Sequence, residues 1–421
     1  MAQAMAQNMF RISQVSLNNV VRCNAYAFAP ATSQAKAYSS ASTTDKEKSK
    51  NPIQKSVFIS QSTDIFTNLA LEDWMYRNFN FNNHHVLLMW RNSPCVVIGR
   101  HQNPWVETNT TNVAHQGMEI ARRNSGGGTV YHDRGNLNLT FFTKREEYNR
   151  RNNLEIVSRA LFREWGIESV ITPREDIVVK NTYKQQISGT AAKLGRPNAY
   201  HHCTLLVDVN KVALRQSLHK DDKGIVTNAT QSVASPIMNL CEINQHVKVE
   251  RMLGAVGWEY LRTCPETLED GGQDLINKQR GFQLINPTDN WFPGLNKLKE
   301  ELSSWDWRFG KTPKFQVNKS FRVPKEFLGE GEMGVQELKV SLEVNKGIID
   351  DVTLKLPPGL LSTNGFHGEV DVVTSLRGQP FSERAVVSLE NALHDMSTKE
   401  GNLQGKSQFV MNCMRQVMQS V

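Results

Sequence analysis

Closely spaced cysteine pairs are absent from this sequence. Its six cysteines form no Cys-x-x-Cys motif and lie scattered at Cys23, Cys95, Cys203, Cys241, Cys264 and Cys413. This spacing argues against a zinc site and against a disulfide framework, so we expect no bound metal and a reducing compartment. The chain also lacks any run of about 18 apolar residues, the length that a membrane-spanning helix needs, so we expect no membrane partner.

Acidic residues are absent from the first 44 positions, where Arg11, Arg22 and Lys36 lie among many Ser, Ala and Asn. This composition is typical of a mitochondrial transit peptide, with an ordinary disordered tail as the alternative. We therefore exclude residues 1–44 from the fold and expect a protein of the mitochondrial matrix. The net charge of +7 favours acidic partners or nucleotide phosphates. No basic cluster is interleaved with aromatic residues, so we expect no nucleic acid partner.

The length of 421 residues allows two or three domains. Between residues 56 and 263, short apolar strands alternate with stretches of helical periodicity, which predicts an α+β domain with a mixed or antiparallel sheet. Residues 264–300 carry Pro, Gly-Gly and charges and read as a linker. Residues 301–421 form a smaller α+β domain, in which Asn345-Lys346-Gly347 predicts the turn of a hairpin and a helix near 385–393 covers it.

Two short apolar stretches, Val86–Trp90 and Cys95–Ile98, are separated by Asn92-Ser93-Pro94. We expect them to form a hairpin, because this turn chemistry commonly joins neighbouring strands. Val96, Val97 and Ile98 would then offer an apolar wall for a ligand with a short hydrocarbon chain.

The most informative stretch spans residues 122–133 and reads Arg-Arg-Asn-Ser-Gly-Gly-Gly-Thr-Val-Tyr-His-Asp. Gly126, Gly127 and Gly128 carry no Cβ, so another molecule can approach their backbone and meet a concavity of N–H groups that accepts anions. Arg123 adds a guanidinium group, which suits phosphate and carboxylate oxygens. No Gly-Lys-Ser/Thr follows, so this is not a Walker loop. We call residues 124–129 the glycine elbow and predict a phosphate-sized site there.

Taken whole, this stretch resembles the signature of lipoate–protein ligases and lipoyltransferases. Further parts of the family pattern are similar to Asn-Leu-Ala-Leu-Glu-Asp-Trp at 68–74, Val-Val-Ile-Gly-Arg-x-Gln-Asn-Pro-Trp at 96–105 and Trp-Asp-Trp-Arg-Phe-Gly-Lys-Thr-Pro at 305–313. The likeness covers residues 58–320 closely, and the mitochondrial lipoyltransferases of animals are the most similar branch. It implies a biotin/lipoate-ligase-type mixed sheet flanked by helices in a catalytic domain at 56–263, with a C-terminal accessory domain at 301–421.

The resemblance also implies a site for lipoyl-AMP. The glycine amides and Arg123 would bind its phosphate, Tyr131 would abut the adenylate, and Arg174 and Thr204 would contact it. The implied binding residues are Arg123, Gly126, Gly127, Gly128, Thr129, Val130, Tyr131, Arg174, Lys184 and Thr204.

The catalytic lysine of the family directly precedes Ile/Val-Ser-Gly and touches the acyl carbonyl and the phosphate. Here Gln186 holds that position, and Lys184 lies two residues earlier. If two inserted residues are absorbed as a bulge, Lys184 reaches the site; if the register is fixed from Ile187 backwards, Gln186 points where the lysine should. The distance from Asp176 to Lys184 along the sequence resembles that in animal lipoyltransferases, which favours the insertion, so we expect Lys184 to be the cation that stabilises the oxyanion.

The function implied is transfer of a lipoyl group, from lipoyl-AMP or a lipoylated carrier protein, to the ε-amine of a lysine. The acceptors would be lipoyl domains of 2-oxoacid dehydrogenase acyltransferase subunits and the glycine-cleavage carrier protein, and we expect a monomeric enzyme. An ATP-dependent lipoate ligase, which also needs ATP and Mg²⁺, is one alternative. A non-catalytic lipoyl-domain binder is another, because of Gln186. Octanoyltransferases and biotin ligases share the fold but fit this motif less well. Asp133 and Asp176 are candidate bases, although structural roles are favoured for both.

Overall fold

The structure is a computed structural model. It describes residues 53–180, 185–220, 223–262, 281–327, 335–357, 360, 376–382, 385, 387 and 404–419. The predicted transit peptide at 1–44 and the catalytic candidate Lys184 lie outside the described residues. Within the described part, no helix combines the length and apolar character that crossing a membrane requires.

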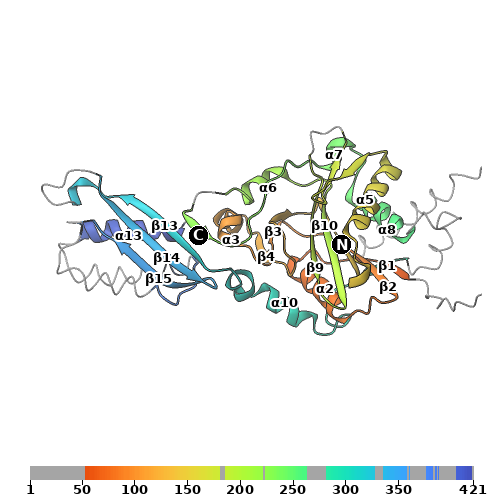
Figure 1. The fold of residues 1–421 in the computed structure, drawn as a ribbon, viewed down its shortest axis with the longest axis horizontal. Coiled ribbons are helices and arrows are strands. Elements are labelled where there is room, and N and C mark those ends of the chain that lie inside the picture. The colour runs from red at the N-terminus through yellow and green to blue at the C-terminus, as the bar shows by residue number, and fades with distance from the viewer. Residues whose placement is uncertain are drawn as a thin grey trace, which may run out of the picture. The chain divides into compact units, whose positions relative to one another are not determined.

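A six-stranded sheet forms the centre of the first domain, in the order β12-β1-β2-β6-β10-β9 (Figure 1). Strand β1 runs parallel to both β2 and β12, and the remaining neighbours are antiparallel. This confirms the predicted mixed sheet. The strands are β1 (Gln54–Ser60), β2 (His84–Trp90), β6 (Asn136–Lys144), β9 (Ser188–Leu194), β10 (Asn198–Leu206) and β12 (Gly281–Ile285).

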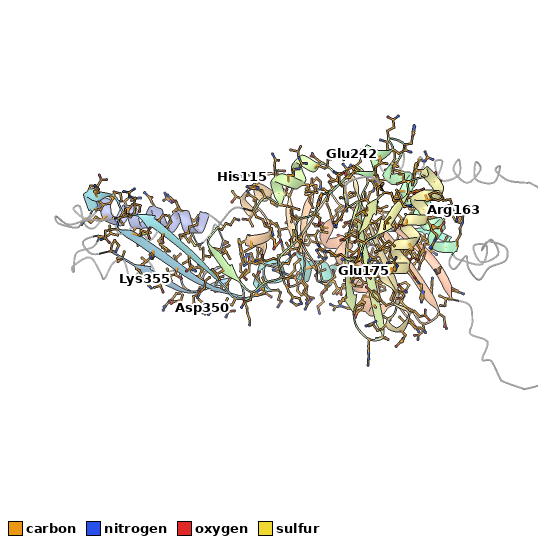
Figure 2. All side chains as sticks on the ribbon, turned by 45° about the horizontal axis from the view of Figure 1, so that its top comes forward. His115, Arg163, Glu175, Glu242, Asp350 and Lys355 are labelled. Atoms are coloured by element: carbon orange, nitrogen blue, oxygen red, sulfur yellow. The ribbon has the colours of Figure 1, made fainter. Side chains whose placement is uncertain are left out.

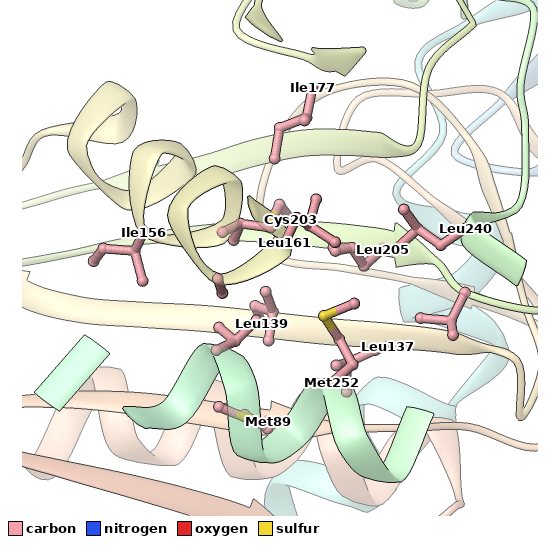
Figure 3. Packing of buried hydrophobic residues seen from close by; sticks show 14 of the residues in the cluster. Met89, Leu137, Leu139, Ile156, Leu161, Ile177, Cys203, Leu205, Leu240 and Met252 are labelled. Atoms are coloured by element: carbon pink, nitrogen blue, oxygen red, sulfur yellow. The ribbon is translucent and has the colours of Figure 1, made fainter. Parts of the chain in front are cut away.

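Helices cover both faces of this sheet. On one face, α5 (Arg150–Trp165) and α8 (Val249–Arg262) pack against alternate side chains of β6 and β10, so that Leu139 and Cys203 are fully covered (Figure 3). On the other face, α2 (Ile65–Asn78) and α10 (Leu295–Ser303) pack over the intervening side chains. Successive side chains of a strand point to opposite faces, so each central strand contributes to two separate apolar layers.

The stretch Cys95–Ile98 does not pair with β2, so the predicted hairpin is wrong. It is β3, the middle strand of a separate sheet with the order β4-β3-β5, where β4 is Glu119–Arg122 and β5 is Val130–His132. All four residues of β3 are buried. Both edges of β2 are already paired, with β1 and with β6, so Cys95–Ile98 has no free edge of β2 to join.

Residues 281–303, most of which belong to the linker expected at 264–300, contribute to the fold of the first domain. Strand β12 extends the central sheet beside β1, and α10 packs on α2. The sequence signal is weak because β12 is short and at the sheet edge, so its side chains are only partly buried.

A second sheet contains four antiparallel strands in the order β11-β13-β14-β15 and packs against α13 (Gln404–Gln419). Its C-terminal strands are β13 (Phe315–Arg322), β14 (Glu337–Asn345) and β15 (Ile348–Lys355), with Asp350 and Lys355 of β15 labelled in Figure 2. Lys346 and Gly347 have φ of 51° and 73°, as a two-residue hairpin turn requires, which confirms the predicted hairpin. Of the helix expected at 385–393, only 385 and 387 are described.

The fourth strand of this second sheet comes from the first domain. Strand β11 (Ile225–Thr227) pairs with β13, and Asn318 N–H donates to Gly224 O at 2.8 Å. It precedes residues 228–236, which we call the strap.

Candidate active site around a glycine elbow

The glycine elbow connects β4 to β5, which lie on either side of β3. The chain therefore crosses the end of β3, where Gly99 follows directly. A Cβ atom on Gly99 would stand 2.1 Å from Gly127 O, so only glycine allows this crossing. Gly127 itself has φ of 88°, in the region that side chains disfavour.

Arg123 holds the elbow from inside. Its Nη2 donates to Gly126 O at 2.6 Å and to Gly128 O at 2.7 Å, and its Nη1 donates to Val97 O at 3.2 Å. Burial lowers the pKa of this guanidinium to about 10, so it remains a cation at neutral pH. Because the carbonyls turn toward Arg123, the amides of Gly126, Gly127 and Gly128 are left without an acceptor in the described part of the chain. Direct contact of Arg123 with a phosphate stays a prediction.

A chain of buried polar groups supports the elbow from the central sheet. Ser125 Oγ lies 3.0 Å from His202 Nε2, and His202 Nδ1 lies 3.0 Å from Glu72 Oε1. Burial acts to raise the pKa of Glu72, but the charge and hydrogen bond of His202 outweigh it and keep that pKa below the usual value. Thr140 Oγ1 also donates to Glu72 at 2.8 Å. Polar residues on otherwise apolar elements are the only sequence signal for this hydrogen-bonded series.

The strap lies on the elbow. Ser232 Oγ accepts a hydrogen bond from Thr129 N–H at 2.8 Å and one from Gln102 Nε2 at 3.0 Å. The Thr129 hydroxyl donates to Gln102 Oε1 at 2.8 Å. Ser232 N–H donates to Glu107 Oε1 at 3.1 Å, and Glu107 belongs to the short helix α3 (Pro104–Glu107). The strap therefore covers the elbow.

Strand β9 borders the elbow on another side. A Cβ atom on Gly127 would be 3.3 Å from Ala191 Cβ, which places β9 in contact with the glycines. Thr204 of β10 accepts from Gly189 N–H at 3.1 Å, and a Cβ on Gly189 would be 3.9 Å from Val130. The structure thus brings Thr204 and Val130 near the elbow, while their contact with an adenylate stays a prediction.

The side chains of Tyr131 and Asp133 both interact with other parts of the protein. Tyr131 is buried beside Val96 and Ile98, and burial, with the nearby carboxylate of Asp133, raises its pKa to about 12. The Asp133 carboxylate accepts N–H groups of Gly135 at 2.8 Å and Asn210 at 2.9 Å. A structural role for Asp133 agrees with these bonds.

The segment that should carry the catalytic cation lies between β8 (Ile177–Val179) and β9. Gln186 Nε2 donates to Asp176 Oδ2 at 2.9 Å, and its backbone pairs with Pro236 and Met238 at the end of the strap. Burial raises the pKa of Asp176, against the charge of Arg174.

Arg174 itself is exposed on the turn before β8. The next residue of that turn, Glu175 (Figure 2), accepts a hydrogen bond from Thr190 of β9 through its carbonyl. This bond places the turn beside the strand that borders the elbow. The role of Lys184, which lies outside the described residues, stays a prediction.

Comparison with known proteins decides the family. Residues 64–257 match the family described as the lipoyl protein ligase A/B catalytic domain. The chain is 41% identical over 308 residues to the mitochondrial lipoyl amidotransferase LIPT1 of Mus musculus, covering 73% of this chain and 77% of that protein. It is 37% identical over 359 residues to that of Homo sapiens, covering 85% and 90%. This chain belongs to the lipoate–protein ligase and lipoyltransferase family.

Membership of the lipoate–protein ligase and lipoyltransferase family makes the chain an enzyme that transfers acyl groups. A lipoate-protein ligase A of Psychrobacter cryohalolentis is also similar, at 36% identity over 253 residues, covering 60% of this chain and 71% of the relative. Among solved structures, the P. falciparum protein LipL1 in complex with lipoate matches with a TM-score of 0.52 and 25% identity, covering 86% of this chain and 99% of that chain. The expected fold class is thereby confirmed.

Arg122 of the family motif has a structural role that the sequence did not indicate. Arg122 is fully buried, and its guanidinium donates to oxygen atoms of the loop before α3 and of the helical turn Asp306–Gly310. Burial and the nearby Arg100 lower its pKa to about 10. The acceptors are Gly99 O, Arg100 O, Gln102 O, Trp307 O, Arg308 O and Thr312 Oγ1.

Proposed function

We propose that this chain is a lipoyltransferase of the mitochondrial matrix that modifies one lysine of lipoyl domains. The acceptors are the acyltransferase subunits of 2-oxoacid dehydrogenases and the glycine-cleavage carrier protein. One observation supports this most directly: Arg123 binds the carbonyls of Gly126 and Gly128, and the three glycine amides have no acceptor among the residues that the structure describes. Such amides suit the phosphate of an acyl adenylate. The mitochondrial relatives support the compartment.

The proposed reaction needs little acid–base chemistry from the protein. The ε-nitrogen of the acceptor lysine attacks the lipoyl carbonyl carbon, an amide bond forms, and the bond from that carbon to the phosphate oxygen breaks to release AMP. Lys184 stabilises the negative charge on the carbonyl oxygen. The acceptor amine must lose a proton, and Asp176 is the better base of the two candidates, because backbone amides hold both oxygens of Asp133.

Three acyl donors test the proposed transferase against two alternatives, an ATP-dependent ligase and a non-catalytic binder. The purified chain is incubated with an apo lipoyl domain and either lipoyl-AMP, a lipoylated glycine-cleavage carrier protein, or lipoate with ATP and Mg²⁺. We expect lipoylated product with lipoyl-AMP or the carrier protein, and none with free lipoate. Product from free lipoate would support the ATP-dependent ligase, for which the ligase relative is a precedent. Binding of the acceptor without product from any donor would support a non-catalytic binder.

The variant Lys184→Ala tests which residue acts as the catalytic cation. Loss of one group that stabilises an oxyanion costs about 3 kcal/mol, so we expect kcat with lipoyl-AMP to fall about a hundredfold. The matched control is Gln186→Ala, because the Gln186 amide already donates to Asp176. We expect this control to retain kcat within about fivefold, the cost of one ordinary hydrogen bond. A large loss in Gln186→Ala together with a normal Lys184→Ala would reject Lys184.

A further inference from the structure

We propose that Ser232 competes with the acyl donor for the elbow: in the free protein its hydroxyl accepts the Thr129 N–H group that a donor phosphate oxygen takes, and Glu107 holds the strap that carries Ser232. The inference rests on the proposed function, since it assigns the elbow to an acyl phosphate. It adds a step that precedes transfer, in which the donor displaces one side chain of the enzyme itself.

The position of Ser232 supports this competition. Thr129 N–H, which donates to Ser232 Oγ at 2.8 Å, directly follows the three glycines whose amides have no acceptor among the described residues. A Cβ atom on Gly128 would be 3.2 Å from Ser232 Oγ, so the hydroxyl lies over the elbow. A phosphate oxygen carries negative charge and accepts N–H groups more strongly than a neutral hydroxyl. The donor phosphate can therefore replace the Ser232 hydroxyl as the acceptor of the Thr129 N–H group.

The Glu107 carboxylate bonds the strap to helix α3. Its side chain is almost fully buried, and its Oε1 accepts Ser232 N–H at 3.1 Å while its Oε2 lies 2.9 Å from Lys220 Nζ. Lys220 precedes the strap and Ser232 lies within it, so one carboxylate binds both. Thr230 N–H adds a bond to His101 O at 3.2 Å.

Backbone hydrogen bonds hold the two ends of the strap to different parts of the chain. Before it, β11 pairs with β13 of the second sheet. After it, Gln186 N–H donates to Pro236 O at 2.8 Å, and Met238 N–H donates to Gln186 O at 3.0 Å. Because backbone hydrogen bonds hold both ends, displacement of Ser232 is confined to the residues between them.

Binding of lipoyl-AMP to the full chain, measured by calorimetry, tests this inference. Ser232→Ala leaves the Thr129 amide free, so we expect about fivefold tighter binding and a lower KM, with kcat changed less than about twofold. Ser232→Asp places a carboxylate on the same amides, and we expect binding at least about tenfold weaker, because the like charges of carboxylate and phosphate repel. Ser235→Ala and Ser235→Asp are matched controls in the same strap, since Ser235 has no hydrogen bond to the elbow among the described residues, and should bind as the wild type does.

Hydrogen exchange of the peptide 124–131 in the free protein gives a readout that needs no donor. We expect faster exchange in Ser232→Ala and an unchanged rate in Ser235→Ala. Unchanged exchange in Ser232→Ala, or weaker lipoyl-AMP binding by that variant, would overturn the inference, the latter because the hydroxyl would then contact the donor. If exchange is faster in Ser232→Ala but neither the wild type nor any variant binds lipoyl-AMP, the proposed function is wrong about the donor. The contact between Ser232 and the elbow would still be supported.

Discussion

Two neighbouring arginines of the family motif have different partners, because successive side chains of an extended segment point to opposite sides. Arg123 turns toward the glycine carbonyls, whereas Arg122 turns toward the helical turn Asp306–Gly310. Neither has a carboxylate among its hydrogen-bond acceptors in the described part of the chain. Carbonyl and hydroxyl oxygens accept from these cations, so their positive charge beside the elbow is not neutralised by a hydrogen-bonded carboxylate of the described residues. That charge favours an anionic donor.

Buried neutral histidines should make the protein sensitive to acid. Burial, together with nearby Arg123, lowers the pKa of His132 to about 3, whereas in the unfolded chain it titrates near 6.5, at about the ordinary value. As pH falls below about 6.5, the unfolded chain therefore binds a proton that the native protein does not, and the free energy of unfolding decreases down to a pH of about 3. Burial also lowers the pKa of His85 to about 4, which adds to the loss.

The variant His132→Gln tests this pH dependence. Between pH 7 and pH 4.5 we expect the wild type to lose about 2 kcal/mol more of its free energy of unfolding than the variant does, measured by urea denaturation. The exposed His115 (Figure 2) supplies the control, and His115→Gln should keep the wild-type pH dependence. Equal pH slopes for His132→Gln and the wild type would show that His132 does not supply this sensitivity.

At the scale of elements, the sequence predicts whatever a local pattern determines. Apolar spacing predicts α2 and α5, and Asn345-Lys346-Gly347 predicts the β14–β15 turn because its backbone geometry is local. Pairing partners are not local. The short run Cys95–Ile98 reads as a strand, but its pattern does not say which sheet it joins. The Ser125–His202–Glu72 contact joins residues far apart in the chain, so only the folded structure brings it together.

Two glycines of α8 make a matched test of how this helix packs. A Cβ atom on Gly254 meets nothing within 4 Å, whereas a Cβ on Gly257 would be 2.3 Å from the ring of Phe282 in β12. We expect Gly254→Ala to raise the free energy of unfolding by about 0.5–1 kcal/mol, because alanine restricts the unfolded chain and favours helix. Gly257→Ala should lower it by about 1–3 kcal/mol through overpacking. Thermal and urea unfolding measure both, and effects of the same sign would contradict the packing of α8 on β12.

At the scale of the whole described molecule, helix α3 joins the elbow to the second sheet. Trp105 belongs to the core of that sheet, with ring centroids 5.3 Å from Phe315 and 5.2 Å from Phe381. Two residues later, Glu107 binds the strap. Strand β11 and the Arg122 guanidinium add further connections. The second sheet is therefore bonded to the elements that shape the elbow, and its removal should disturb the site.

Arg122→Met removes the most buried of these connections while keeping similar side-chain volume. The variant leaves six oxygen atoms, from Gly99 to Thr312, without their donor. A buried acceptor left without its donor costs about 1–3 kcal/mol, so for several acceptors we expect a total loss of about 3–5 kcal/mol. We expect urea denaturation to show that loss, and transfer activity to fall with it, because Arg122 also holds the loop that bears Gly99.

The control for this variant is Arg251→Met, whose guanidinium pairs with Glu164 on the surface at 2.7 Å. Exposed pairs contribute at most about 1 kcal/mol, so this control should unfold nearly as the wild type does. Limited proteolysis at residues 304–314 adds a spatial readout, because cleavage there should accelerate in Arg122→Met and not in Arg251→Met. Equal losses of stability and equally slow cleavage in the two variants would contradict a role for Arg122. Trp105 and β11 would then hold the second sheet to the elbow.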